Sequence, residues 1–135
     1  MLAKINPKKT NAWKKLASHY VVMKDRLMKD MFASDPERYA KFSLAFEDIL
    51  VDFSKNIINQ ETLEFLVGLA HEVKLAEAIG QMFSVEKINE TEKRPVLHVA
   101  LRNRSNAPVY VDGNDVIPDV NAALDHMREF SQKVI

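Results

Sequence analysis

The sequence predicts a mainly α-helical fold with a small β component, a short hairpin and a short strand, as a single segment over residues 1–135. Three observations lead to this prediction. Apolar residues recur at helical spacing through most of the chain. They alternate at strand spacing over Ser43–Phe53, and a short apolar run at 108–111 precedes an Asp-Gly turn. At 135 residues the chain can bury a core without disulfide bonds.

The first predicted helix is long, about six turns, and begins after Thr10, whose hydroxyl can accept from a free backbone N–H. Ser34 and Glu37 form a capping-box pair around Pro36, which predicts a short second helix ending near Phe42. The apolar face expected to be buried on the first helix comprises Trp13, Leu16, Ala17, Tyr20, Leu27 and Met31.

The segment Ser43–Phe53 changes to strand periodicity. Leu44 and Phe46 alternate in one phase, and the apolar residues from Ile49 to Phe53 alternate in the other. A slip of one residue at Glu47-Asp48 is typical of a tight turn or a bulge. We expect a small hairpin or bent strand that lies against the helices, because an isolated hairpin is not stable.

The second half again predicts helices. Asn59 caps one, with a break near Lys74 followed by a helical continuation, and Pro95 opens a short helix over Val96–Arg102. The last helix starts near Asp115–Pro118, and its pattern runs to Ile135 without a stop signal, so we expect a chain cut within a helix. Leu75, Ile79, Met82 and Phe83 continue the helical pattern after the break, and the residues expected to be buried in the helices on either side are Leu63, Leu66, Val67, Ala70, Val73, Val120, Ala123, Leu124, Met127, Phe130 and Val134.

Composition excludes several classes of protein. Lysine plus arginine equals aspartate plus glutamate at 19 each, so no net field favours nucleic acid or anionic lipid. Cysteine is absent, which excludes a disulfide scaffold, a thiol nucleophile and a Cys-ligated zinc site. No apolar stretch approaches the ~20 residues that span a bilayer, and no signal peptide is recognisable. A reducing cytoplasm is the simplest compartment.

A search for catalytic, cofactor or metal residues assigns none. The nucleotide and acyl-transfer motifs are missing, and no two histidines lie at i, i+4 to form a helical metal pair. A surface or hydrogen-bonded core position is the preferred interpretation for each of the histidines. The acids near the hairpin are interpreted as solvated turn and edge charges rather than a metal or acid–base pair. The residues concerned are His19, His71, His98, His126, Glu47, Asp48 and Asp52.

The most distinctive stretch lies at 88–106. Glu92 and Arg94 precede an apolar helix that carries His98 and Arg102 one turn apart, and Arg104 follows the helix end. An anion site for phosphate is one interpretation, because arginine forks fit phosphate oxygens. The preferred one is a buried helix with cationic residues at its carboxyl end and ion pairs to its neighbours.

The same stretch resembles the phosphoglucose isomerase family, also called glucose-6-phosphate isomerase. Residues 91–106 read TEKRPVLHVALRNRSN, and the resemblance continues in order through MKDMF at 28–32, DPERY at 35–39, FSL at 42–44, ILVDFSKN at 49–56 and DGNDVIPDVN at 112–121. It covers nearly the whole chain, from about Trp13 to Ser131. Pro95 stands where a small helix former is expected, a change that the first turn of a helix tolerates.

The resemblance implies a cofactor-free enzyme that interconverts glucose 6-phosphate and fructose 6-phosphate by proton transfer through an enediol. It implies an intertwined homodimer of two sugar-isomerase (SIS-type) α/β domains, of which this chain is the amino-terminal part. The family's catalytic glutamate, histidine and lysine and its Ser/Thr-rich phosphate loop lie downstream of this region, so no catalytic residue is carried over. We expect the fragment to be inactive, structural, and prone to self-association through exposed apolar surface.

A self-contained helical protein-interaction module is the alternative function. The helix-rich pattern and the lack of a catalytic constellation favour it, whereas the consecutive family-like segments oppose it. The reading frame beyond Ile135 discriminates between the two, because the isomerase requires a phosphate loop and a catalytic set there. Binding to nucleic acid or to a membrane is not expected.

Overall fold

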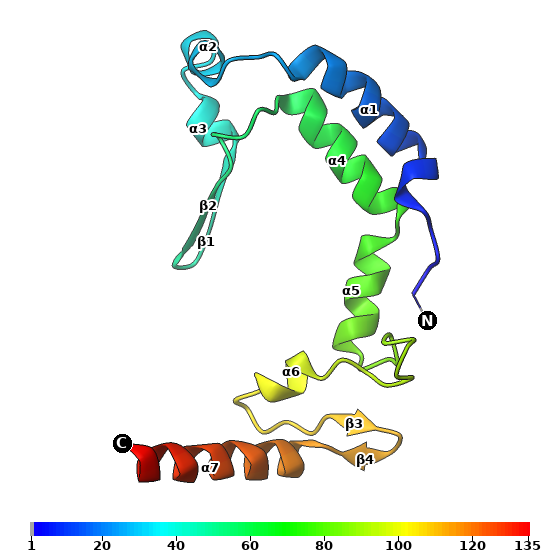
Figure 1. Cartoon of the computed structure of the whole chain (residues 1–135), viewed down its shortest axis with the longest axis vertical. Helices are drawn as coiled ribbons and strands as arrows, with labels where there is room; N and C mark the ends of the chain where they lie inside the picture. Colours follow the sequence, from blue (N-terminus) through cyan, green and yellow to red (C-terminus); the bar gives the residue numbers. More distant parts are fainter. Residues whose placement is uncertain (1) are drawn as a thin grey trace. The chain divides into compact units, whose positions relative to one another are not determined.

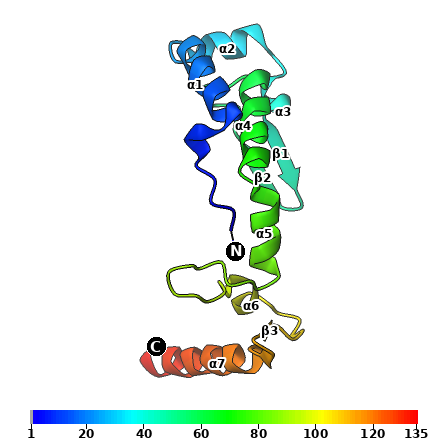
Figure 2. The same cartoon turned by 90° about the vertical axis from the view of Figure 1, so that its right-hand side faces the viewer.

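The computed structural model describes residues 2–135, which divide into two compact units (Figure 1 and Figure 2). The amino-terminal unit spans Lys4–Leu75, and the carboxy-terminal unit is built around Ala76–Ile135. The regular elements among the described residues are helices and two short antiparallel strand pairs. This confirms the predicted mainly α fold with a small β component. None of the described helices combines the length and the apolar character needed to cross a bilayer.

Each unit contributes helices and one strand pair. The amino-terminal unit contains η1 (Pro7–Lys9), α1 (Asn11–Met23), α2 (Met28–Ser34), α3 (Arg38–Lys41), β1 (Ser43–Phe46), β2 (Ile49–Asp52) and α4 (Gln60–Glu72). The carboxy-terminal unit contains most of α5 (Leu75–Phe83), then α6 (His98–Leu101), β3 (Tyr110–Val111), β4 (Asn114–Asp115) and α7 (Ile117–Val134).

Helices α1 and α4 lie side by side and form the centre of the amino-terminal unit. Thr10 caps α1 as predicted, since its Oγ1 accepts from the backbone N–H of Trp13 at 3.2 Å. The carboxylate of Glu72, the last residue of α4, accepts from the N–H groups of Asn11 and Ala12 at the start of α1, at 2.8 and 3.0 Å. A carboxylate at a helix amino terminus satisfies otherwise unpaired N–H groups and complements the helix dipole.

The buried face of α1 differs from the predicted one. Ala12, His19 and Met23 are buried, whereas Trp13 is 38% and Tyr20 65% exposed. The predicted apolar stripe is thus rotated by about a quarter turn from the face that α4 covers. The carboxylate of Glu72 and the polar residues at the start of α4 fix which face of α1 packs, and periodicity alone does not reveal such polar contacts.

The single long first helix was also a wrong prediction. Helix α1 ends at Met23 with Lys24 as its cap, Leu27 is extended, and α2 begins at Met28 as a separate helix. Val21, Val22 and Asp25 have low helix propensity, so little opposes the break.

The predicted capping box of Ser34 and Glu37 does not form. Ser34 is the last residue of α2, and its hydroxyl donates to the Met31 carbonyl at 3.2 Å. Helix α3 has no side-chain cap hydrogen bond at Glu37, and Phe42 ends it as predicted. The helix start lies after Pro36 rather than before it, which removes the geometry that a capping box needs.

Helix α4 begins as the sequence predicts. Asn59 and Thr62 cap each other's backbone N–H groups, at 2.9 and 3.1 Å. The break near Lys74 is confirmed by its positive φ of 60°. The predicted stripe is only partly covered within the described residues, since Leu66 and Val67 remain exposed. The side of α4 that packs against α1 carries Gly68, where an added Cβ would lie 3.8 Å from the Cβ of Ala12.

The hairpin is confirmed, with β1 and β2 antiparallel and the turn at Glu47-Asp48. Its register pairs Leu44 with Val51 and Phe46 with Ile49, so the two sequence phases meet on one face. All four of these side chains are between 52% and 70% exposed. The prediction that the hairpin lies against the helices is therefore wrong for residues 2–135.

The carboxy-terminal unit contains the predicted Asp112–Gly113 turn between β3 and β4. Both residues have positive φ, 51° and 83°, which is the geometry of a tight hairpin turn. The helix predicted over Val96–Arg102 is shorter, because Asn89 and Arg94 pair as a β-bridge and hold the residues before it in a turn.

Helix α7 starts within the predicted window and continues to Val134. Pro118 lies in its first turn, where a missing N–H costs nothing. Its amino-terminal half is partly covered, but Met127, Phe130 and Val134 are each more than three-fifths exposed. The predicted burial of these three residues is wrong within residues 2–135, since no described element covers that end of the helix.

Candidate functional site

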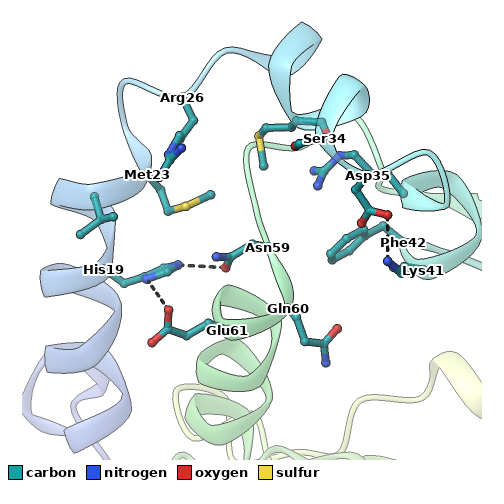
Figure 3. Close-up of a pocket in the computed structure, with 13 residues that line it drawn as sticks. His19, Met23, Arg26, Ser34, Asp35, Lys41, Phe42, Asn59, Gln60 and Glu61 are labelled. Atoms are coloured by element: carbon teal, nitrogen blue, oxygen red, sulfur yellow. Dashed lines mark hydrogen bonds and ion pairs between the residues drawn. The ribbon is translucent and has the colours of Figure 1, made fainter.

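An open cleft of about 850 Å³ lies in the amino-terminal unit (Figure 3). Side chains from α1, α2 and α3 and from the start of α4 line it, and several carry a positive charge. The lining residues are His19, Val22, Met23, Arg26, Met31, Ser34, Asp35, Arg38, Lys41, Phe42, Asn59, Gln60 and Glu61.

His19 is a buried side chain on one wall of this cleft. Its Nε2 lies 3.1 Å from Asn59 Oδ1 and 2.8 Å from Thr62 Oγ1. The Thr62 hydroxyl donates to Asn59 Oδ1, which can only accept, so the hydrogen-bond network assigns the proton to His19 Nε2. On the other side of the ring, Nδ1 lies 3.4 Å from a Glu61 carboxylate oxygen. His19 therefore joins α1 to the cap of α4, as a hydrogen-bonded core histidine.

Arg38, on α3, is the most buried charged side chain among the described residues, at 3% exposure. Its Nε donates to the Ser54 carbonyl at 2.8 Å, and its Nη2 donates to the carbonyls of Asn56 and Ile58 at 2.7 and 2.9 Å. A guanidinium fork matches several acceptors at once, which an ammonium group does not. Arg38 thereby fixes the irregular segment that leads from β2 to α4.

Two aromatic rings hold the same guanidinium from its faces. The Arg38 Cζ lies 4.7 Å from the ring centre of Phe42 and 5.6 Å from that of Phe32. Phe42 is itself buried and meets Phe53 edge to face at 6.0 Å. These contacts orient Arg38 and desolvate it, which strengthens its hydrogen bonds.

Two further charges of the cleft, Lys41 and Asp35, pair with each other. Lys41 Nζ donates to Asp35 at 2.8 Å, and this hydrogen bond is the main reason that the pKa of Lys41 is raised above its ordinary value. Beyond the cleft, the hydroxyl and the N–H of Ser54 hydrogen-bond to Asp52 and lower the pKa of that carboxyl below its ordinary value. The predicted role of Glu47 and Asp48 as turn charges is confirmed by their place between β1 and β2.

The stretch at 88–106 matches the preferred structural interpretation in part. Arg94 forms an ion pair with Glu92, and Arg102 caps α6 with Nη1 at 3.5 Å from the His98 carbonyl. His98 and Arg102 line a shallow pocket of about 460 Å³ in the carboxy-terminal unit, with the apolar Met82, Phe83 and Val99. The helix itself is more exposed than predicted, since of its four residues only Ala100 is fully buried.

The four histidines lie on four different helices: His19 on α1, His71 on α4, His98 on α6 and His126 on α7. Within residues 2–135, no three histidine, cysteine, aspartate or glutamate side chains are grouped so as to hold a metal ion. Two polar side chains of the cleft, His19 and Arg38, instead bind capping and backbone atoms of the chain itself.

The search of the sequence for functional residues did not single out Arg38. Its three acceptors are backbone carbonyls that lie 16 to 20 residues further along the chain. Every residue has such a carbonyl, so the residue types at these positions do not mark them as partners of Arg38. A single sequence marks a residue by local spacing, so a side chain that acts on distant backbone carbonyls leaves no pattern to find.

Comparison with protein-family models gives a match to the family described as phosphoglucose isomerase over residues 52–135. The match begins at the last residue of β2 and contains α4, α5, α6, β3, β4 and α7. It includes the distinctive stretch at 88–106 and covers more than half of the chain.

Proposed function

The chain belongs to the phosphoglucose isomerase family, and we propose that it is the amino-terminal structural part of a longer two-domain glucose-6-phosphate isomerase. The complete enzyme interconverts glucose 6-phosphate and fructose 6-phosphate, a step of glycolysis and gluconeogenesis, by proton transfer through an enediol. In this proposal residues 1–135 position other parts of the enzyme, need no cofactor, and do not turn over the sugar phosphate alone. The proposed compartment is the cytoplasm, on the strength of the family.

The observation that carries this proposal is that two polar side chains of the cleft bind other parts of their own chain. Arg38 binds three backbone carbonyls, and His19 binds the cap of α4. A group that is fully hydrogen-bonded to its own chain supports the scaffold, whereas a catalytic group must reach the substrate. The family match adds the kind of enzyme that such a scaffold would serve.

A coupled assay tests the proposed inactivity. The purified chain is given fructose 6-phosphate together with glucose-6-phosphate dehydrogenase and NADP, so that any glucose 6-phosphate formed is oxidised and detected. The chain is produced in a host that lacks its own isomerase. We expect no rate above that of the buffer blank, and turnover proportional to the concentration of the chain would overturn the proposal.

A helical protein-interaction module is the second candidate, favoured by the exposed apolar residues of the hairpin and of α7. Co-expression with the downstream part of a family member, in the same isomerase-deficient host, separates the two. Recovered isomerase activity supports the structural part of an enzyme. Two well-folded polypeptides that do not associate and show no activity support the module.

The exposed apolar surfaces also support a proposal about partners. Several large hydrophobic side chains of the hairpin and of α1 are more than half exposed. Contiguous patches of this kind mark interaction surfaces in soluble proteins. We propose that the chain self-associates, and that neither nucleic acid nor a membrane is its partner.

A further inference from the structure

We propose that the carboxyl end of α5 is a joint that opens locally, and that the strained backbone of Val85 sets how often it opens. The α5 joint is the set Ser84, Val85 and Glu86. Val85 has a φ of 62°, a value that side chains branched at Cβ rarely adopt. The inference concerns the carboxy-terminal unit alone and is independent of the proposed function.

The closed joint ends α5 with two backbone hydrogen bonds. The N–H of Glu86 donates to the Gln81 carbonyl at 3.0 Å. The N–H of Val85 donates to the Met82 carbonyl at 3.3 Å. This pair of bonds is the Schellman motif, in which the residue at the position of Val85 has a positive φ and is usually glycine. Valine forms the same turn against its own conformational preference.

Val85 stands apart from the other residues with positive φ. Within residues 2–135, six non-glycine residues have a positive φ, and Val85 alone among them is branched at Cβ. Asparagine and aspartate tolerate this conformation because their short side chains hydrogen-bond locally. A branched Cβ instead crowds the neighbouring carbonyl, so the α5 joint has the strongest local bias toward another conformation. The other five residues are Glu47, Lys74, Lys93, Asn106 and Asp112.

The last turn of α5 is weakly held. Gly80 lies in this turn, where an added Cβ would meet no atom within 4 Å, and glycine lowers the stability of a helix interior. The turn has no basic residue to complement the helix dipole. The Ser84 hydroxyl also donates to the Gln81 carbonyl, at 3.3 Å. This carbonyl therefore keeps a partner when the N–H of Glu86 moves away, which lowers the cost of opening.

The segment that follows the joint is tied to other parts of the same unit. Lys87 Nζ forms an ion pair with Asp112, in the turn between β3 and β4, at 2.8 Å. The backbone N–H groups of Asn89 and Arg94 donate to each other's carbonyls at 3.2 and 3.3 Å. Because these contacts hold the chain on the far side of the joint, the change of backbone direction on opening is confined to Ser84–Glu86 and the last turn of α5.

This last turn forms part of the pocket of about 460 Å³ described above. Met82 and Phe83 line the pocket from α5, and the remaining lining residues belong to α6 and its cap. The Met82 carbonyl is an acceptor of the closed joint, so opening at Val85 displaces this wall. Opening therefore changes the shape of the pocket and exposes Met82, which is partly covered in the closed form.

Amide hydrogen exchange measures the opening directly. We expect the protection factor of the Glu86 amide, measured by NMR, to rise about tenfold in Val85→Gly, because glycine adopts positive φ without the penalty of an L side chain. Val85→Asn should raise it by a smaller factor, since asparagine also tolerates positive φ but is less flexible than glycine.

Val73→Gly is the matched control. Val73 also lies at the end of a helix, but its φ is −86°, which valine adopts without strain. The amide that follows it, that of Lys74, donates to the His71 carbonyl at 3.0 Å. In Val73→Gly the protection of the Lys74 amide should fall, because glycine only adds flexibility there. The same substitution is thus expected to act with opposite sign at the two helix ends.

Oxidation of Met82 by hydrogen peroxide tests whether the opening reaches the pocket. Val85→Gly should slow the oxidation of Met82 at least about twofold, because the closed joint keeps the side chain covered. Met127, which is 64% exposed on α7, should be oxidised at an unchanged rate and serves as the internal reference.

The outcomes decide the two parts of the inference separately. A Glu86 amide that is unprotected in every variant, or no better protected in Val85→Gly and Val85→Asn than in the original chain, contradicts a strained joint at Val85. Higher protection with an unchanged rate of Met82 oxidation contradicts the link between the joint and the pocket. Higher protection together with slower oxidation supports both parts.

Discussion

The base of the β1–β2 hairpin and the face of the same hairpin are stabilised in opposite ways. At the base, Ser54 is almost fully buried and accepts from Arg38, while its N–H and hydroxyl hydrogen-bond to Asp52. At the face, Leu44 and Phe46 have more than three-fifths of their surface exposed. The base is held by polar contacts within residues 2–135, whereas the face has no cover there.

This difference shows which contacts the unit can complete from its own residues. A hydrogen bond from Arg38 to a carbonyl is short and directional, so a few residues can form it. Burial of an apolar face requires a second extended surface of matching shape, which is provided by another layer of structure. The hairpin is thus anchored firmly at one end and presents an apolar surface at the other.

Removal of the Arg38 side chain should destabilise the base of the hairpin, and we expect this change to have the largest effect on the free energy of unfolding. Arg38→Met keeps the length of the side chain but leaves the carbonyls of Ser54, Asn56 and Ile58 without their donor. We expect a loss of about 3 kcal/mol in the free energy of unfolding, measured by urea denaturation. Arg26→Met is the control, because Arg26 lines the same cleft but is exposed, and it should change stability by less than about 0.5 kcal/mol. Equal effects of the two variants would contradict the assigned role.

The parts that sequence could predict are those whose signals are local. The caps at Thr10 and Asn59 are predictable because the backbone N–H groups that donate to their side chains lie only three residues away, and the Asp112–Gly113 turn follows from the residue pair itself. The hairpin is predictable for the same reason. Strand side chains alternate with a period of two, so a one-residue slip of the apolar alternation at Glu47-Asp48 indicates a turn.

The parts that sequence missed depend on contacts between distant segments. The apolar stripe of α1 was read correctly as a stripe, yet the buried side is the one that Glu72 and the cap at Asn59 select. Arg38 was not singled out, since its partners lie far along the chain. Periodicity reveals that a helix has an apolar side but not which neighbour will cover it.

Removal of His19 should loosen the contact between α1 and α4 without altering the hairpin base. His19→Leu keeps a buried side chain of similar size but removes the donor to Asn59 and Thr62. We expect a loss of about 1 to 2 kcal/mol, smaller than for Arg38 because the two acceptors keep their bond to each other. His71→Leu, on the exposed side of α4, should have little effect, and a comparable loss there would contradict the prediction.

A glycine substitution should instead tighten the α1–α4 pair. A Cβ at Gly68 would lie 3.8 Å from the Cβ of Ala12, an ordinary contact distance. Gly68→Ala should therefore raise the free energy of unfolding by about 0.5 to 1 kcal/mol through the helix propensity of alanine. Gly113→Ala is the contrasting variant, because its φ of 83° disfavours any Cβ, and it should lower stability by about 1 kcal/mol. A thermal-unfolding series on both variants measures the two signs.

The smallest effect concerns the pH dependence of the hairpin base. Hydrogen bonds from Ser54 lower the pKa of Asp52 below its ordinary value of 3.8, so the carboxylate is favoured in the folded chain. Its contribution to stability is present above pH 3.8 and is lost as the pH falls through the lower folded value. Asp52→Asn should reduce the urea midpoint at pH 7, and this difference from the unmodified chain should shrink as the pH approaches 3.

Ser54→Ala supplies the partner variant for this test, because it removes the hydroxyl donor to Asp52 while the backbone N–H remains. The pKa of Asp52 should then rise toward 3.8, and the pH-dependent part of the stability should diminish but not vanish. In the double variant, Asp52→Asn should remove the pH-dependent part that remains in Ser54→Ala, since the backbone N–H of Ser54 still donates to the Asp52 carboxylate there. A midpoint difference between Asp52→Asn and the unmodified chain that stays constant from pH 7 to pH 3 would show that the carboxylate charge does not stabilise the base of the hairpin.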